Sequence, residues 1–211
     1  METSQCHITV AQISELRGLT GAGILDCREA LQESGGDIEG AKSFLRQKGE
    51  DISLGRSVKP TGSGTVGNYL HHNGSIGTMV VVTCETDFVA ATEDLKSFAH
   101  EVALHVAATK PEFIGREDVP SFAVATEEVF LSEQAASSGK PANVIAQMVK
   151  GRMGKFFSAH CLLEQPFVRD DKRTVGDLLN DVRIKVGERV EIESFCWMGL
   201  QDVSLVKRGE S

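Results

Sequence analysis

The chain has 211 residues, of which 41% are hydrophobic, and its 30 acidic and 22 basic side chains give a formal net charge of −8. This length can bury one or two hydrophobic cores, and the composition is that of a soluble globular protein. The acidic balance argues against binding to a phosphate backbone, which needs a concentrated positive surface. No apolar run approaches the roughly 20 residues that cross a bilayer, and the N-terminus lacks a secretory signal. We therefore expect neither a nucleic acid nor a membrane as a direct partner.

The cysteines are odd in number, widely scattered and without a Cys-x-x-Cys pair: Cys6, Cys27, Cys84, Cys161 and Cys196. This usage predicts reduced thiols in a reducing compartment. We expect the cytoplasm, or an organellar matrix if a transit peptide has been removed. Whether Cys196 or another thiol joins two subunits is left open by the sequence.

The first fifty residues carry apolar side chains at helical spacing, which predicts three short helices. The first runs from Ile8 to Arg17 and the second from Ile24 to Ser34, with Thr20 as the expected N-cap of the second. Asp37 is the expected cap of the third helix, and Gly49 is the glycine that is expected to end it. This segment, residues 1–52, is predicted to form a compact three-helix domain.

Residues 53–64 are rich in Gly, Ser and Lys and show no apolar periodicity, which predicts a linker. Two β-rich runs follow, Thr65–His71 and Ile76–Cys84. The pair Asn73-Gly74 between them is a strong hairpin signal. Residues 65–200 are predicted to form an α+β core with a small antiparallel sheet packed against helices, and 201–211 a tail.

The rest of the core alternates between helical and extended patterns. Pro166 places its extended segment at a sheet edge. The expected elements are a helix from Glu93 capped by Thr92, helices over Ala125–Ser138 and Pro141–Ala159, an extended segment Leu162–Val168, a helix capped by Thr174 that runs through Val182, and a final strand Arg189–Trp197.

The segment Glu85–Ala90 lies where the apolar strand Ile76–Cys84 passes into the helix from Glu93. It places the carboxylate of Asp87 beside the aromatic ring of Phe88, and a short junction between rigid elements fixes where such side chains point. No base, nucleophile or metal cluster lies near them in sequence. The pattern favours docking to a protein partner. Two simpler interpretations stay open, with Asp87 as a helix N-cap and Phe88 as a core side chain.

Three sequence patterns are typical of enzymes, but each of them lacks the structural context that the enzyme's chemistry needs. Gly62–Gly67 has the glycine spacing of a dinucleotide site, but it opens a strand and not a helix. His100 and His105 are five residues apart, so they do not share one helix face as zinc ligands do. His71 and His72 are adjacent on a strand and point to opposite sides. We therefore expect no catalysis, no cofactor and no metal site.

Three sets of residues, in order along the chain, cover most of its length: Leu16–Leu31 with Gly36–Glu39 and Leu45–Gly49; Glu85–Ala90; and Gly139–Pro141, Gly151–Met153, Gln165–Val168 and Thr174–Leu179. Together they resemble the elongation factor Ts family of bacteria and organelles. The resemblance implies a guanine-nucleotide exchange factor that binds elongation factor Tu and promotes GDP release. It also implies that the junction Thr86-Asp87-Phe88-Val89 lies near the partner's magnesium and phosphate site.

The same resemblance implies that the N-terminal domain is similar to ubiquitin-associated domains. Arg17, Ile24 and Leu25 match its contact surface for elongation factor Tu, and His72 matches a contact made by the core. The chain has one hairpin and one Thr-Asp-Phe-Val element, so it resembles the short members of the family, for which a homodimer is a possible source of the missing half. The alternative is a ubiquitin-associated-like adaptor that binds proteins without exchanging nucleotide.

Overall fold

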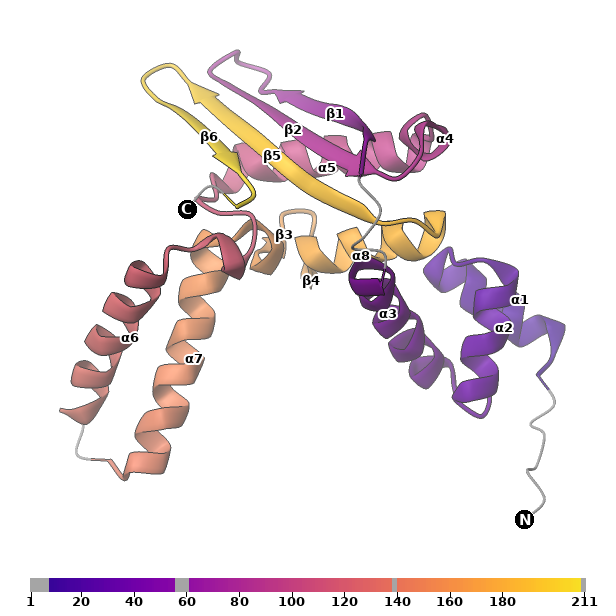
Figure 1. The fold of residues 1–211 in the computed structure, drawn as a ribbon, viewed down its shortest axis with the longest axis horizontal. Helices are drawn as coiled ribbons and strands as arrows, with labels where there is room; N and C mark the ends of the chain where they lie inside the picture. Colours follow the sequence, from indigo (N-terminus) through magenta and orange to yellow (C-terminus); the bar gives the residue numbers. More distant parts are fainter. Residues whose placement is uncertain (1–7, 56–60, 138–139, 210–211) are drawn as a thin grey trace. The chain divides into compact units, whose positions relative to one another are not determined.

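The computed structural model describes residues 8–55, 61–137 and 140–209 (Figure 1). Predictions that concern Cys6, residues 56–60 of the linker and the last two residues lie outside this part of the chain. The fold is α+β, as predicted. It divides into two compact units. The predicted boundaries at residues 52, 64 and 200 are not tested by this division and stay predictions.

The first unit takes in the described residues up to Thr65, together with Val82–Phe98 and Asp177–Glu191. Its N-terminal part consists of three helices, α1 (Val10–Thr20), α2 (Ile24–Glu33) and α3 (Ile38–Gly55). The predicted cap of α3 is confirmed, because the Gly40 N–H donates to Asp37 Oδ2 at 2.7 Å.

Two predicted helix ends are wrong. Gly49 does not end α3, which continues to Gly55. A side chain at Gly49 would lie 3.0 Å from Ile184, so this glycine allows close packing and not termination. Thr20 is not the cap of α2, because Gly23 takes that position. Instead, α1 extends to Thr20, whose hydroxyl donates to the Leu16 carbonyl at 2.8 Å.

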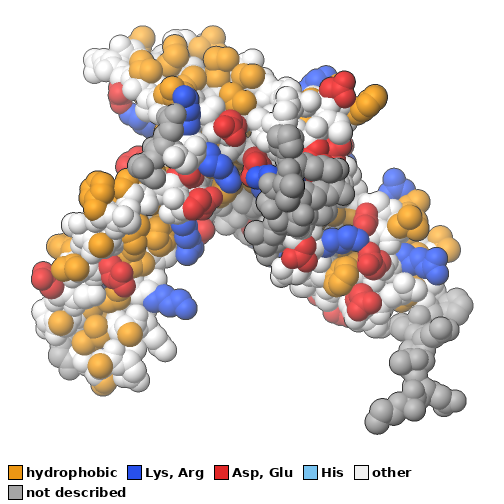
Figure 2. Space-filling model, viewed as in Figure 1, with side chains coloured by type: hydrophobic (Ala, Val, Ile, Leu, Met, Phe, Trp, Pro, Cys, Tyr) orange, Lys and Arg blue, Asp and Glu red, His pale blue; other side chains and the backbone are white. Residues whose placement is uncertain are grey.

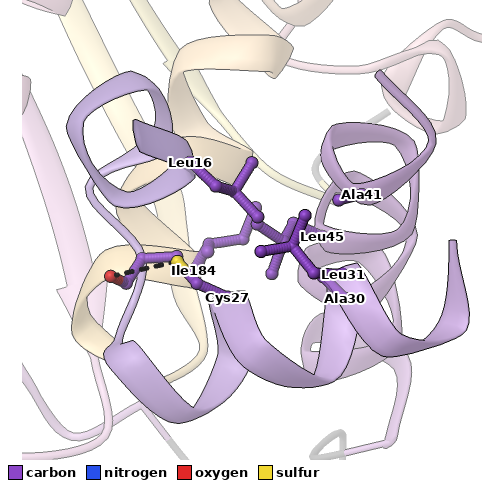
Figure 3. Close-up of a cluster of buried hydrophobic side chains, with 8 residues drawn as sticks. Leu16, Cys27, Ala30, Leu31, Ala41, Leu45 and Ile184 are labelled. Atoms are coloured by element: carbon purple, nitrogen blue, oxygen red, sulfur yellow. Dashed lines mark hydrogen bonds between the residues drawn. The ribbon is translucent and has the colours of Figure 1, made fainter. Parts of the chain in front are cut away.

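A hydrophobic cluster holds the three helices together (Figure 3). One member, Ile184, comes from α8 (Val175–Val186), far along the chain. Each fully buried leucine contributes about 1.5–3 kcal/mol relative to an exposed one, so the cluster is the main source of stability here. Its members are Leu16, Ala22, Cys27, Ala30, Leu31, Ala41, Leu45 and Ile184.

The first unit also contains the end of β2 (Ile76–Cys84), the one-turn helix α4 (Asp87–Ala90) and the start of α5 (Glu93–Thr109). Thr92 caps α5 as predicted, since its hydroxyl accepts the Leu95 N–H at 3.3 Å. A salt bridge joins Asp94 of α5 to Lys185 of α8. The salt bridge thereby links the first turn of α5 to the last turn of α8.

The main sheet has the strand order β1-β2-β5-β6, with β1 (Ser63–Leu70), β5 (Val190–Gly199) and β6 (Val203–Lys207). The two predicted strands of the hairpin are confirmed. The prediction that Arg189–Trp197 is the last strand is wrong, because β6 pairs antiparallel with β5. This strand lies inside the segment that was predicted to be a tail.

Helix α5 packs against one face of this sheet (Figure 1). The Thr78 hydroxyl donates to the Ala103 carbonyl at 2.7 Å, and Trp197 Nε1 donates to the Ala107 carbonyl at 3.4 Å. Gly67 allows this close approach, since a Cβ there would lie 2.2 Å from the Ala99 carbonyl oxygen.

The other elements of the second unit are α6 (Ser121–Ala136), α7 (Ala142–His160) and a two-stranded sheet of β3 (Pro166–Phe167) and β4 (Asp170–Thr174), together with single turns of 3-10 helix at Arg116–Asp118 and Leu162–Glu164. The predicted helices near 125–138 and 141–159 are confirmed. The extended segment Leu162–Val168 is confirmed only in part, because its first residues form a 3-10 turn. Strand β4 was not predicted.

His105 is fully buried in this unit. The Val168 N–H donates to His105 Nδ1 at 3.2 Å, which leaves the ring hydrogen on Nε2, 2.9 Å from Gln165 Oε1. Burial lowers the pKa of His105 from its ordinary value. The ring therefore joins α5 to the segment around β3 by two hydrogen bonds.

Candidate partner-binding site

The junction between β2 and α5 presents an aromatic ring to solvent. Phe88 is 83% exposed, whereas Val89 beside it is buried. Thr86 is the N-cap of α4, and its hydroxyl accepts the Val89 N–H at 3.3 Å. Both simpler interpretations are therefore wrong, because Thr86 and not Asp87 caps the helix, and Phe88 is not a core side chain. Asp87 is exposed in the first turn of α4.

A second segment of the first unit holds this junction through two carboxylates. Glu188 accepts both the backbone N–H of Thr86, at 3.1 Å, and its hydroxyl, at 2.7 Å. In the opposite direction, Glu85 accepts the N–H of Arg189 at 3.0 Å. We call Glu85, Thr86, Glu188 and Arg189 the carboxylate clasp.

The other predicted contact residues of this unit lie at the end of α1 and the start of α2. Ile24 is 55% exposed and Leu25 is 77% exposed, although the helix that they begin buries other side chains in the cluster. Arg17 is exposed in the last turn of α1. Figure 2 shows hydrophobic side chains among charged ones over this part of the molecule. Ile24 and Leu25 thus expose apolar area at the start of α2, and Arg17 exposes a cation at the end of α1.

His72 belongs to the second unit, whereas the other predicted site residues belong to the first. It is exposed in the turn between β1 and β2, and its ring centroid is 4.3 Å from that of His71. The expectation that these two side chains point to opposite sides is therefore wrong, because both residues lie beyond the end of β1 at Leu70. His71 is in turn within 3.1 Å of the Tyr69 hydroxyl. His72 is therefore accessible, with an aromatic neighbour on one side.

Within residues 8–55, 61–137 and 140–209, no group of three or more His, Cys, Asp or Glu side chains is placed to hold a metal ion. Among the same residues, no helix has the length and apolar character that a membrane crossing needs. Four cysteines are described as free thiols: Cys27, Cys84, Cys161 and Cys196. Burial raises the pKa of Cys161 to about 12, so it is inert as a nucleophile.

The sequence matches a family model described as elongation factor TS over residues 27–196. It is also 47% identical over 203 residues to an elongation factor Ts of Carboxydothermus hydrogenoformans, a match that covers 96% of this chain and 93% of the relative. An elongation factor Ts of Moorella thermoacetica is 45% identical over 188 residues, covering 89% and 93% of the two chains. The chain belongs to the elongation factor Ts family. The family predicted from the sequence is thereby confirmed.

The family model includes the junction at Phe88 and the clasp, but it begins after Leu25. The similarity to the elongation factor Ts of Carboxydothermus hydrogenoformans extends further, since it leaves out only a small share of this chain. Family membership therefore rests on the body of the protein and not on one short motif.

Sequence reasoning did not find the clasp residues Glu188 and Arg189. They lie about one hundred positions from Thr86, in a short polar turn after a helix, and a carboxylate there has no local pattern that distinguishes it from a solvated side chain. Only the pairing of segments in the fold reveals their partners.

Proposed function

We propose that this chain is a guanine-nucleotide exchange factor that binds elongation factor Tu and promotes the release of GDP. The observation that carries the proposal is the exposed ring of Phe88 beside Asp87, on a turn whose opposite side is buried. An aromatic side chain that is both exposed and rigidly held suits insertion into a partner. Family membership supports the choice of partner.

The proposed mechanism needs no covalent step, so the protein is not an enzyme in the strict sense and uses no cofactor. A factor that binds the nucleotide-free partner more tightly than the GDP-bound one must weaken GDP binding by the same ratio. Mg²⁺ demands near-octahedral coordination and bridges the phosphates, so small displacements of its supports loosen the nucleotide. Phe88 would separate two elements of elongation factor Tu, while Asp87 contacts groups beside the ion.

The other predicted site residues have two distinct roles in this proposal. Arg17, Ile24 and Leu25 supply affinity for elongation factor Tu, and His72 makes a further contact from the second unit. Thr86 and Val89 act through the turn, because Thr86 is engaged by Glu188 and Val89 is buried. The place of action is the compartment that holds the partner, the bacterial cytoplasm or, if a transit peptide has been removed, an organellar matrix.

The deciding measurement is the rate of GDP release from elongation factor Tu, loaded with a fluorescent GDP, with and without the chain. Phe88→Ala should lower the stimulated rate by about 30-fold, which corresponds to the ~2 kcal/mol that defines an interface hot spot. Phe122→Ala is the matched control, since Phe122 is also a largely exposed phenylalanine but lies on α6. Full stimulation by Phe88→Ala would exclude the insertion of this ring.

The adaptor alternative predicts a different result in the same experiment. The unchanged chain would bind elongation factor Tu, or another protein, through the surface of Arg17, Ile24 and Leu25 without raising the rate of GDP release. Binding without stimulation would therefore exclude the exchange factor and favour the adaptor.

A homodimer is the second part of the proposal, and the open face of the main sheet supports it. Residues paired across β5 and β6 share a face, so Cys196, Met198, Val203 and Leu205 lie together on the side opposite Trp197, which packs on α5. Met198, Val203 and Leu205 are each more than half exposed. Figure 2 shows hydrophobic side chains gathered over this part of the sheet.

Exposed apolar strands of this kind are typical of interfaces. Sedimentation equilibrium should give twice the chain mass of 22.8 kDa. Leu205→Lys should shift the population to the monomer, whereas a monomer in the unchanged chain would exclude the dimer. A non-reducing gel would then tell whether Cys196 forms a bond between the subunits.

A further inference from the structure

We infer that Glu188 is a positioning residue for nucleotide exchange, which acts by holding Thr86 and through it the orientation of Phe88. The inference rests on the proposed function for its effect on GDP release. The contact itself is a property of the free chain and can be tested without elongation factor Tu. Glu188 lies in the turn between α8 and β5, and it is not a predicted contact of the partner.

Every polar group of Thr86 has a partner within the first unit. Its N–H and its hydroxyl hydrogen both go to the carboxylate of Glu188. Its hydroxyl oxygen accepts the Val89 N–H, and its carbonyl accepts the Ala90 N–H at 3.1 Å and the Cys84 thiol at 3.1 Å. The geometry of this residue is therefore fixed from three directions, and two of its five hydrogen bonds are made to Glu188.

Glu188 is itself held in a rigid turn. Gly187 has a φ of 68°, a left-handed conformation that ends α8, and its N–H donates to the Arg183 carbonyl at 2.9 Å. The buried guanidinium of Arg183 then donates from Nε to the Val190 carbonyl at 2.8 Å. The residues on both sides of Glu188 are thus fixed to α8, so its carboxylate is presented in one direction.

Helix α4 depends on this support because it has only four residues. The first turn of a helix fixes several backbone angles for one hydrogen bond, so a single turn is unstable alone. Val89 is the buried side chain of α4, and the cap from Thr86 supplies its first hydrogen bond. Hydrogen bonds to a carboxylate are stronger than those between neutral groups, so Glu188 is the largest polar contribution to the turn.

The reciprocal bond from Glu85 to Arg189 gives the clasp a second connection. Loss of either carboxylate leaves one connection of the clasp, and loss of both removes the clasp while β2 and β5 stay paired. The effects of changing Glu85 and Glu188 on the amide exchange rates of the turn should therefore be coupled. The fold-increase in the double variant should exceed the product of the fold-increases in the two single variants.

The contact is tested on the free chain by amide hydrogen exchange. Glu188→Ala should raise the exchange rates of the Thr86, Val89 and Ala90 amides by at least about 10-fold. Glu188→Gln should fall between Ala and the unchanged chain, since its amide oxygen still accepts from the Thr86 N–H. Glu193→Ala, an exposed carboxylate on β5, is the control and should leave these amides unchanged. Unchanged protection in Glu188→Ala would overturn the inference.

The role in exchange is tested by separating kcat from KM for GDP release. Glu188→Ala should lower kcat by about 10-fold while KM for GDP-bound elongation factor Tu changes less than about twofold, because the surface of Ile24 and Leu25 is untouched. If Glu188→Ala instead caused a general loss of folded protein, the concentration of active protein and the thermal midpoint would both fall. Glu188→Gln would then restore neither of these two quantities.

The decisive control is the double variant with Phe88→Ala. If Glu188 acts through Phe88, its removal should cost nothing further once that ring is gone, whereas an additive loss would overturn the inference. A chain that fails to stimulate GDP release without any substitution would refute the proposed function. The hydrogen-exchange result would then still decide whether Glu188 holds the turn.

Discussion

Two exposed surfaces of the first unit, the Phe88 turn and the start of α2, are held in place by different means. Helix α2 has ten residues and places Cys27, Ala30 and Leu31 in a continuous hydrophobic cluster. Helix α4 has four residues and a single buried side chain, and it depends on hydrogen bonds to the carboxylate clasp. One surface is held by apolar area and the other by directed polar contacts.

Side chains distant from a partner can therefore matter unequally at two surfaces of one protein. A surface that rests on a cluster of many contacts tolerates the loss of any one polar group nearby. A surface that rests on a few hydrogen bonds keeps a defined direction only while each of them is intact.

The largest effect is expected from the cluster beneath α2. Leu31→Ala should lower the free energy of unfolding by about 2–5 kcal/mol, because it removes a fully buried side chain and leaves a cavity. Urea denaturation followed by circular dichroism measures the loss. Leu25→Ala on the exposed side of the same helix should change stability by less than about 0.5 kcal/mol. Equal effects of the two variants would contradict the apolar origin of this support.

The pH dependence of the free energy of unfolding should distinguish polar from apolar support. In the second unit, His105 provides such a pH dependence. Its folded-state pKa is lowered by burial, while the unfolded chain takes up the proton near the ordinary value of 6.5. The unfolded state therefore binds more protons than the folded state below about pH 6.5. The contribution of neutral His105 to the free energy of unfolding is thus fully present above that pH. It falls as the pH drops, by at most about 1.4 kcal/mol per pH unit.

Urea denaturation at pH 7.5 and pH 5.5 tests this expectation. His105→Gln should be less stable at pH 7.5 by about 1–3 kcal/mol, because the Val168 N–H loses its acceptor. The same variant should show a smaller difference between the two pH values than the unchanged chain. Leu31→Ala should retain the full difference. A pH dependence that survives in His105→Gln would assign the effect to other groups.

The smallest effect is expected at a helix cap. Asp37→Ala should cost about 1 kcal/mol, since it removes the acceptor for the Gly40 N–H at the start of α3. A long helix packed on a cluster should survive this loss without a change in structure, so amide exchange should increase only in the first turn. Increased exchange throughout α3 would mean that α2 and α3 depend on polar contacts as α4 does.

The sequence predicted those elements whose signals are local. Asp37 and Thr92 precede apolar residues at helical spacing, and both cap the helices expected of them. The Asn73-Gly74 turn lies between β1 and β2 as expected. The sequence placed Phe88 at a junction that favours docking, but the choice between a surface and a core side chain required the fold.

The errors have physical causes that no local pattern carries. Gly49 has the sequence context of a helix end, but it is selected by the approach of Ile184 from a distant helix. Strand β6 alternates exposed and half-exposed residues at a sheet edge, so it lacks the apolar signal of a buried strand. The acceptor of the Thr86 N–H is set by the pairing of loops that are far apart in sequence.

The position of Ile184 among α1, α2 and α3 affects how the protein should respond to proteolysis. A chain cleaved once between Gly55 and Ser63 would still keep a side chain of its C-terminal fragment in the cluster of its N-terminal fragment. The salt bridge between Arg46 and Asp177 would join the same two fragments. The cleaved protein should therefore migrate as one particle under native conditions and separate only in denaturant.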